Sequence, residues 1–110
     1  MKHADLEALR RDAVSSPLGE SFTALSTRRD QRIGVGVRTK GDEADYFVEV
    51  IVTLCPEGEL NLTGIEGKLS LLKSLEARGY ALNCEGDGSI SCEKHLPASA
   101  VEAEIETLQG

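Results

Sequence analysis

The 110-residue sequence predicts an α+β domain in which helices pack on one face of an antiparallel sheet. Three observations lead to this fold class. Apolar residues recur at helical spacing in three segments, one near each end of the chain and one in its second half. Segments in which apolar and polar residues alternate lie between these, as is typical of strands. Turn residues separate neighbouring strands. We therefore expect one domain over residues 1–110 with the element order α-β-β-β-α-β-β-α.

The first helix is expected at residues 4–14, where Leu6, Leu9 and Ala13 share one side. The Ser15-Ser16-Pro17 run then ends it. Residues 18–30 are harder to interpret. Some alternation at 20–27 is compatible with an extra strand or with a loop, and the sequence leaves both open.

Two clear strand patterns follow. In residues 32–39, Ile33, Val35 and Val37 alternate with polar residues and glycine, and a turn at residues 40–43 ends the strand. The pattern at residues 45–55 has apolar residues on both faces, so we place this strand centrally in the sheet. After a turn at residues 55–58, a short strand at 59–62 is expected to lead into the second helix.

The second helix has start and stop signals. Thr63 and Glu66 match a capping box, and Gly79 stands where a left-handed residue ends a helix. Four residues at helical spacing are expected to face the core: Ile65, Leu69, Leu72 and Leu75.

The last part of the chain predicts a hairpin and a third helix. A three-residue loop at Gly86-Asp87-Gly88, with Gly88 left-handed, pairs Cys84 with Ile90 and Leu82 with Cys92. This register keeps the apolar residues of both strands on one face. Pro97 can then open a final helix whose inner side carries Val101, Ile105 and Leu108.

Composition and charge narrow the function classes. The net charge is −7, with +3 over residues 1–40 and −10 over residues 41–110, which is compatible with a polarised surface or with solvated faces. No apolar run is long enough to span a membrane or to act as an export signal, so we expect a cytoplasmic protein without a membrane partner. An odd number of cysteines, three, is then best interpreted as reduced thiols.

A metal or redox site is the alternative function that the sequence allows. Cys84, Cys92 and His95, together with Cys55, offer the ligand types of tetrahedral zinc. The spacing lacks a C-x-x-C pair, and alternation assigns Cys84 and Cys92 to the core, so packing is the favoured interpretation and no cofactor is expected. A cysteine nucleophile at Cys92 with His95 as its base is also conceivable, but residues three apart on a strand project from opposite faces. No catalytic residue is therefore assigned, and an enzyme is not expected.

The glycines of the strand at 32–39 allow two interpretations. Gly34 and Gly36 leave one face bare, which a neighbouring side chain, Phe47 or Ile51, can cover. Alternatively, they form a shallow groove that is flanked by Arg32 and Arg38 and accepts a segment of a partner. These four residues (Arg32, Gly34, Gly36 and Arg38) are the candidate binding site.

The sequence does not predict nucleic acid as a partner. The basic residues lack interleaved aromatic side chains, and the protein is acidic with a pI of about 4.8. This set comprises Arg28, Arg29, Arg32, Arg38 and Lys40.

The element order resembles that of the type III secretion chaperone-like family, including its YbjN-like relatives. Small size, acidity and an amphipathic C-terminal helix are similar as well. The resemblance implies the α-β-β-β-α-β-β-α plan and identifies no functional residue. Our first functional hypothesis is a non-enzymatic, chaperone- or adaptor-like module. It would bind a protein or peptide through a sheet edge or a helix face, and it could also pair with a second copy as a homodimer.

Overall fold

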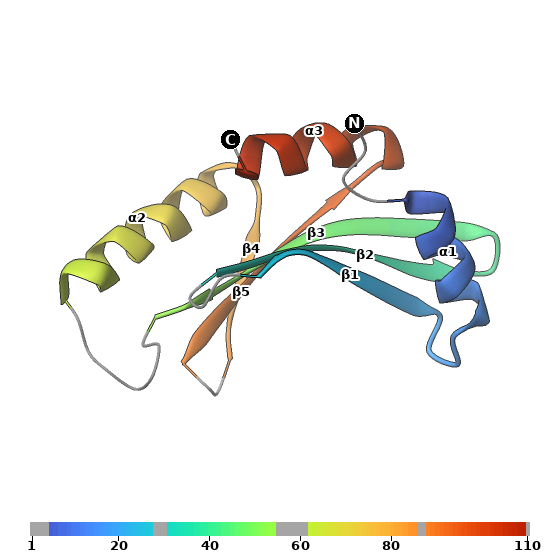
Figure 1. Ribbon diagram of the computed structural model, residues 1–110, viewed down its shortest axis with the longest axis horizontal. Coiled ribbons are helices and arrows are strands. Elements are labelled where there is room, and N and C mark those ends of the chain that lie inside the picture. The colour runs from blue at the N-terminus through green and yellow to red at the C-terminus, as the bar shows by residue number, and fades with distance from the viewer. Residues whose placement is uncertain (1–4, 28–30, 55–61, 86–87, 110) are drawn as a thin grey trace. The chain divides into compact units, whose positions relative to one another are not determined.

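The structure is a computed structural model that describes residues 5–27, 31–54, 62–85 and 88–109 (Figure 1). The side chains of residues 26, 27 and 62–65 are outside this description. Eight elements follow one another along the chain and match the predicted order α-β-β-β-α-β-β-α. They are α1 (Leu6–Ser15), β1 (Glu20–Thr27), β2 (Gln31–Lys40), β3 (Glu43–Thr53), α2 (Leu62–Ala77), β4 (Ala81–Cys84), β5 (Ser89–Leu96) and α3 (Ala98–Gln109).

The five strands form one antiparallel sheet in the order β1-β2-β3-β5-β4. β3 occupies the centre, as the apolar residues on both of its faces predicted. The stretch at 20–27 is a strand, which answers the question that the sequence left open. Residues 59–61 of the predicted short strand lie outside the described residues, and Leu62 already belongs to α2. Three strands precede α2 as predicted, but β1 takes the place of the short strand that was expected at 59–62.

The chain divides into two compact units, and β2 and β3 contribute to both. The first unit comprises Met1–Leu25, Gly34–Val48 and His95–Gly110. The second comprises Ser26–Ile33 and Glu49–Lys94.

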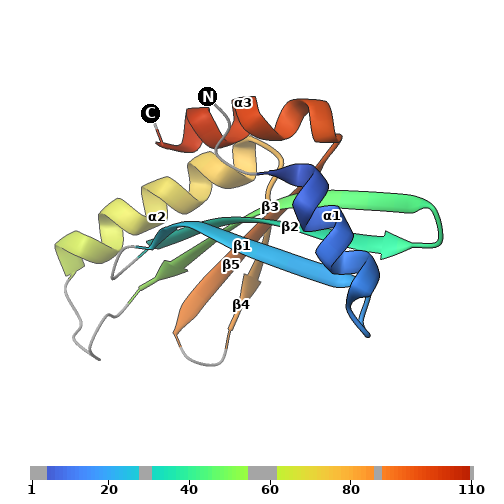
Figure 2. The ribbon, with the colours of Figure 1, turned by 45° about the vertical axis from the view of Figure 1, so that its right-hand side comes forward.

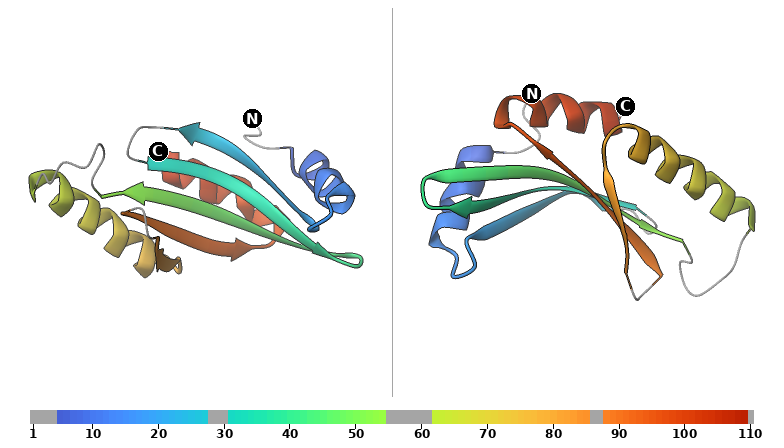
Figure 3. Two further views of the ribbon diagram at one scale, coloured as in Figure 1. Left: turned by 90° about the horizontal axis from the view of Figure 1, so that it is seen from below. Right: turned by 180° about the vertical axis from the view of Figure 1, so that it is seen from behind.

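In the first unit, α1 and α3 lie over the same face of the strands (Figures 1 and 3). The Asp5 carboxylate caps α1 by accepting a hydrogen bond from the Ala8 amide at 3.1 Å, because the first amides of a helix lack backbone partners. The hydroxyl of Ser21 donates to the Leu9 carbonyl at 2.5 Å and joins α1 to β1. The core of this unit consists of Leu9, Ala13, Val35, Val37, Tyr46, Val48, Val101 and Ile105.

In the second unit, α2 runs through a turn into β4, which pairs with β5 (Figure 2). The helix ends as the sequence predicts: Gly79 has φ +95°, the Gly79 amide donates to Glu76 and the Tyr80 amide donates to Leu75. The buried apolar side chains are Ile33, Val50, Val52, Leu72, Leu75, Tyr80 and Cys92.

One prediction for the face of α2 is wrong, since Leu69 is 45 % exposed. Each three-residue step along a helix falls about 60° short of a full turn, so Leu69 lies at the flank of the face that Leu72 and Leu75 bury. The side chains of Thr63 and Ile65 are outside the description, and the Thr63 backbone is already helical.

The β4–β5 hairpin confirms the predicted register. Leu82 pairs with Cys92, Cys84 pairs with Ile90, and Gly88 has φ +85°. Cys92 is fully buried, but Cys84 is exposed, contrary to its assignment to the core. The physical reason is that Cys84 is the last residue of β4, a four-residue strand at the edge of the sheet, where few neighbouring side chains shield it from solvent.

Among the described helices, none combines the length and the apolar character needed to cross a membrane.

Candidate functional site on the open face and edge of the sheet

The bare face of β2 is filled by two phenyl rings. Phe22 of β1 lies over Gly34, where an added Cβ would meet its Cε1 at 2.8 Å. Phe47 of β3 lies over Gly36, where an added Cβ would meet its Cε1 at 2.7 Å. The structure thus shows the covered arrangement that the sequence allowed, with Phe22 supplying a second cover that the sequence did not predict. The space expected for a shallow groove above the two glycines is occupied.

Around these rings lies a group of side chains, all in the first unit, that we call the open-face cluster. It comprises Glu20, Phe22, Arg38, Asp45, Phe47 and His95. The Phe22 and Phe47 rings are stacked at an interplanar angle of 22° with their centroids 6.5 Å apart. The Arg38 guanidinium carbon lies 4.3 Å from the Phe47 centroid, and the His95 ring centroid lies 5.9 Å from it. Phe47 is therefore surrounded on the open face and only 6 % exposed.

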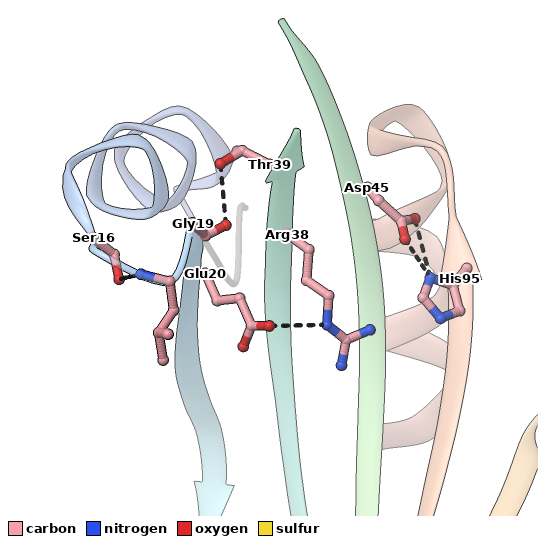
Figure 4. A network of polar contacts seen from close by, with 8 residues as sticks. Ser16, Gly19, Glu20, Arg38, Thr39, Asp45 and His95 are labelled. Carbon is pink, nitrogen blue, oxygen red and sulfur yellow. Dashed lines mark hydrogen bonds and ion pairs between the residues drawn. The ribbon is translucent and has the colours of Figure 1, made fainter. Parts of the chain in front are cut away.

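Two polar pairs border the cluster, an ion pair between Arg38 and Glu20 and a hydrogen bond between His95 and Asp45 (Figure 4). Arg38 Nε lies 3.6 Å from Glu20 Oε1, and His95 Nδ1 lies 2.9 Å from Asp45 Oδ2. All four side chains are between 43 % and 57 % exposed, so solvent screens these contacts and each pair contributes at most about 1 kcal/mol. Their effect is to orient the side chains around Phe47. The Arg38 contact with that ring adds roughly 0.5–1 kcal/mol.

The start of β1 is tied to the end of β2. The Thr39 amide donates to the Gly19 carbonyl at 2.7 Å. The Thr39 hydroxyl donates to the same carbonyl at 3.0 Å (Figure 4). Gly19 has φ +69°, a left-handed conformation that glycine adopts without strain. This anchor fixes where β1 begins and so places Phe22 beside Gly34.

β1 lies at one edge of the sheet, with β2 as its strand neighbour. Half of the backbone N–H and C=O groups of an edge strand point away from the sheet. Three consecutive residues of β1, Phe22, Thr23 and Ala24, are exposed, and Phe22 is 49 % exposed although its ring covers Gly34. The described part of the molecule thus leaves both faces of this stretch accessible.

The two arginines of the candidate binding site line two different hollows. Arg38 lines one of about 570 Å³ at the β2–β3 turn, together with Thr39, Lys40, Glu43, Ala44 and Asp45. Arg32 lines another of about 470 Å³ in the second unit, together with Glu49, Ile51, Thr53, Glu85, Ser89 and Ser91. Both linings mix acidic and basic side chains. Arg28 and Arg29, from the predicted basic set, lie outside the described residues.

The cysteines occupy different environments. Burial, with a smaller contribution from the Glu49 carboxylate, raises the pKa of the Cys92 thiol to about 11. Cys84 is exposed on β4, its cross-strand partner is Ile90, and Cys55 lies outside the described residues. His95, the third predicted metal ligand, pairs with Asp45. Within residues 5–27, 31–54, 62–85 and 88–109, no group of three or more Cys, His, Asp or Glu side chains could hold a metal ion.

Sequence reasoning missed Glu20 and Phe22. The available signal is the bare Gly34-Val35-Gly36 stretch, which allows large side chains of the neighbouring strands to approach closely. The weak alternation at residues 20–27 does not distinguish a strand from a loop, so the sequence indicates covering side chains only from the strand at 45–55.

Comparison of the chain with known protein families, curated proteins and solved structures finds no match.

Proposed function

We propose that this protein is a non-enzymatic binding module that takes up an extended segment of a partner protein along the outer edge of β1. The observation that carries the proposal is the run of exposed residues Phe22, Thr23 and Ala24 on an edge strand. An added strand would satisfy the outward backbone groups of β1 by main-chain hydrogen bonds, and it would cover the exposed part of Phe22.

The composition of β1 supports this choice of edge. Protein sheets commonly protect their edges with short strands, lysine, proline or bulges. β1 is eight residues long, contains no lysine or proline, and has Glu20 as its single charged residue. The other edge strand, β4, has only four residues and offers a much shorter ladder.

Phe22 supplies the side-chain part of the surface. Its ring rests on Phe47 and Gly34, so it is positioned before a partner arrives and loses little conformational entropy on binding. Aromatic side chains held in this way are frequent hot spots of protein interfaces. We therefore expect Phe22→Ala to weaken binding at least tenfold.

The proposal is tested with peptides selected from a random display library on the folded protein. The affinity of a selected peptide is compared for wild type, Phe22→Ala and Leu69→Ala. Leu69 is a matched control because it is a large apolar residue of similar exposure on α2. Loss of affinity in Phe22→Ala alone is expected. Equal affinity in all three proteins would contradict the assignment of the site.

Backbone pairing is tested by methylating the peptide amides. Two versions of the peptide carry N-methyl groups on alternate residues, so that only one version loses the N–H groups that point toward β1. One version should lose binding and the other should keep it. If both bind equally, no strand is added. A stable dimer whose β1 amides are protected from hydrogen exchange before any peptide is added would show that a second copy occupies the edge, and would overturn the proposal.

A redox-responsive domain remains the second hypothesis, without the metal site, because no three Cys, His, Asp or Glu side chains of the described residues are grouped to hold a metal ion. The raised pKa of Cys92 keeps that thiol protonated near neutral pH, so the exposed Cys84 is the better candidate for reaction.

A further inference from the structure

The side chains beside the outer edge of β1 specify a chemical pattern for the partner segment. This inference rests on the proposed function. Residues two apart along a strand share one face, so Glu20, Phe22 and Ala24 lie on the open face. The contact of Glu20 with Arg38 and the position of Phe22 over Gly34 confirm that face for the first two. A strand added to β1 would place alternate side chains beside these three residues.

Phe22 and Ala24 favour large apolar neighbours. One side of the Phe22 ring stacks on Phe47, and the ring remains 49 % exposed. Side chains opposite one another on neighbouring strands have Cβ atoms about 5 Å apart, which brings an apolar residue against this exposed part. Ala24 is exposed and small, so the position beside it has room for an aromatic ring that also reaches Phe22 diagonally.

Glu20 favours a basic neighbour. Its carboxylate is 53 % exposed and is the only charge on β1. Arg38, which faces Glu20, is on β2, one strand further from the outer edge, and its guanidinium is also held over Phe47. The one charge that β1 itself presents to an added strand is therefore negative.

The charge of the whole chain points the same way. With a net charge of −7, this protein repels a second copy of itself and attracts a basic segment, and these long-range forces affect association rates before contact. Of the occupants that could add a strand to β1, a basic segment is the one that complements both Glu20 and the chain as a whole.

We infer that the partner segment is an extended strand carrying a basic residue, an apolar residue and an aromatic residue at alternate positions, which lie beside Glu20, Phe22 and Ala24. Written along the segment, the pattern is basic-x-apolar-x-aromatic or its reverse, depending on the direction in which the strand is added. Parallel and antiparallel additions differ only in this order.

The test compares peptides selected by three forms of the full chain. These are wild type, Glu20→Arg, and Glu106→Arg as a control that changes the net charge equally on α3. Glu106 is exposed, so the control leaves the core intact. Far-ultraviolet circular dichroism shows that each variant is folded before selection begins.

Wild type and Glu106→Arg should both enrich a basic residue two positions from an apolar one, and Glu20→Arg should enrich an acidic residue there. A selected peptide whose basic residue is changed to Glu should bind wild type at least fivefold more weakly and Glu20→Arg more tightly. If the peptides depend on Phe22 but show the same charges with Glu20→Arg, the inference fails and the proposed function stands. If no form selects any peptide, the proposed function itself fails.

Discussion

Gly36→Ala and Gly34→Ala form a matched pair of substitutions, because each adds one methyl group beneath one phenyl ring of the open-face cluster. The rings differ in their freedom to move. Phe47, over Gly36, is 6 % exposed, and Phe22, over Gly34, is 49 % exposed. The two variants should therefore differ in stability although the chemical change is the same.

The expected cost of Gly36→Ala follows from the packing of Phe47. An added Cβ would lie 2.7 Å from ring atoms, so the ring must shift against the Arg38 guanidinium and the Phe22 ring. Overpacking of this kind costs typically 1–3 kcal/mol. Alanine in a strand is favoured over glycine by roughly 0.5–1 kcal/mol, which offsets part of the cost. We expect Gly36→Ala to lower the free energy of unfolding by about 1–2 kcal/mol.

Gly34→Ala should have little effect on stability. The half-exposed Phe22 ring can rotate toward solvent, and losing about half of the roughly 1.5–3 kcal/mol that full burial of a phenyl ring contributes leaves a cost near 1 kcal/mol. The gain from alanine nearly cancels this cost. The free energy of unfolding should stay within about 0.5 kcal/mol of wild type.

The assay is equilibrium unfolding in urea, with free energies compared at an unchanged denaturant slope. A Phe47→Ala background supplies the control. Without the ring, Gly36→Ala should be neutral or stabilising, which gives a coupling energy of more than 1 kcal/mol between the two positions. The reasoning would be refuted if Gly36→Ala were as stable as wild type, or if its cost persisted in the Phe47→Ala background.

Three further predictions concern other parts of the chain. The Cys92 thiol has a pKa of about 11, against 9.0 for an exposed thiol. The contribution of the protonated thiol to stability is therefore complete below pH 9, and about 2–3 kcal/mol is lost as the pH rises toward 11. A Cys92→Ala variant that loses as much stability over this pH range as wild type would disprove this. Asp5→Ala should cost about 1 kcal/mol in thermal unfolding, whereas Asp5→Asn should retain most of the cap that Asp5 provides to Ala8. Gly79→Ala should cost about 1–2 kcal/mol because φ is +95° there, and a neutral effect would show that the helix ends in another way.

Local signals in the sequence predicted much of the fold. The β4–β5 register followed from a loop length and a left-handed Gly88, and the end of α2 followed from Gly79, because both depend on residues a few positions apart. The central place of β3 followed from one apolar face and a second face that mixes apolar and polar residues. The exposure of Leu69 and Cys84 could not be predicted in this way, because it depends on how far a neighbouring element covers a face.

The open-face cluster was harder to predict for the same reason. The sequence indicates Arg38 and Gly36 as candidate residues, but Glu20 and Phe22 lie in a Ser- and Thr-rich stretch whose alternation is weak. Their contacts with β2 depend on the pairing of β1 with β2, and the amino acids between these strands do not specify that register from the sequence alone.

The two bare glycines of β2 also have a consequence for the order of folding. Gly34 and Gly36 bring no side chain of their own to the open face. The side-chain packing of β1 on that face therefore depends on the Phe22 ring, which contacts Gly34 and Phe47 only after β2 and β3 have paired. The β2–β3 hairpin is local and closes through a turn in which Gly41 has φ +62°, so it can form early. We therefore expect a transition state in which β2 and β3 are paired and β1 is still detached. Phe22→Ala would then speed unfolding and leave the folding rate unchanged, and a φ-value near 1 at Phe22 would reverse this order.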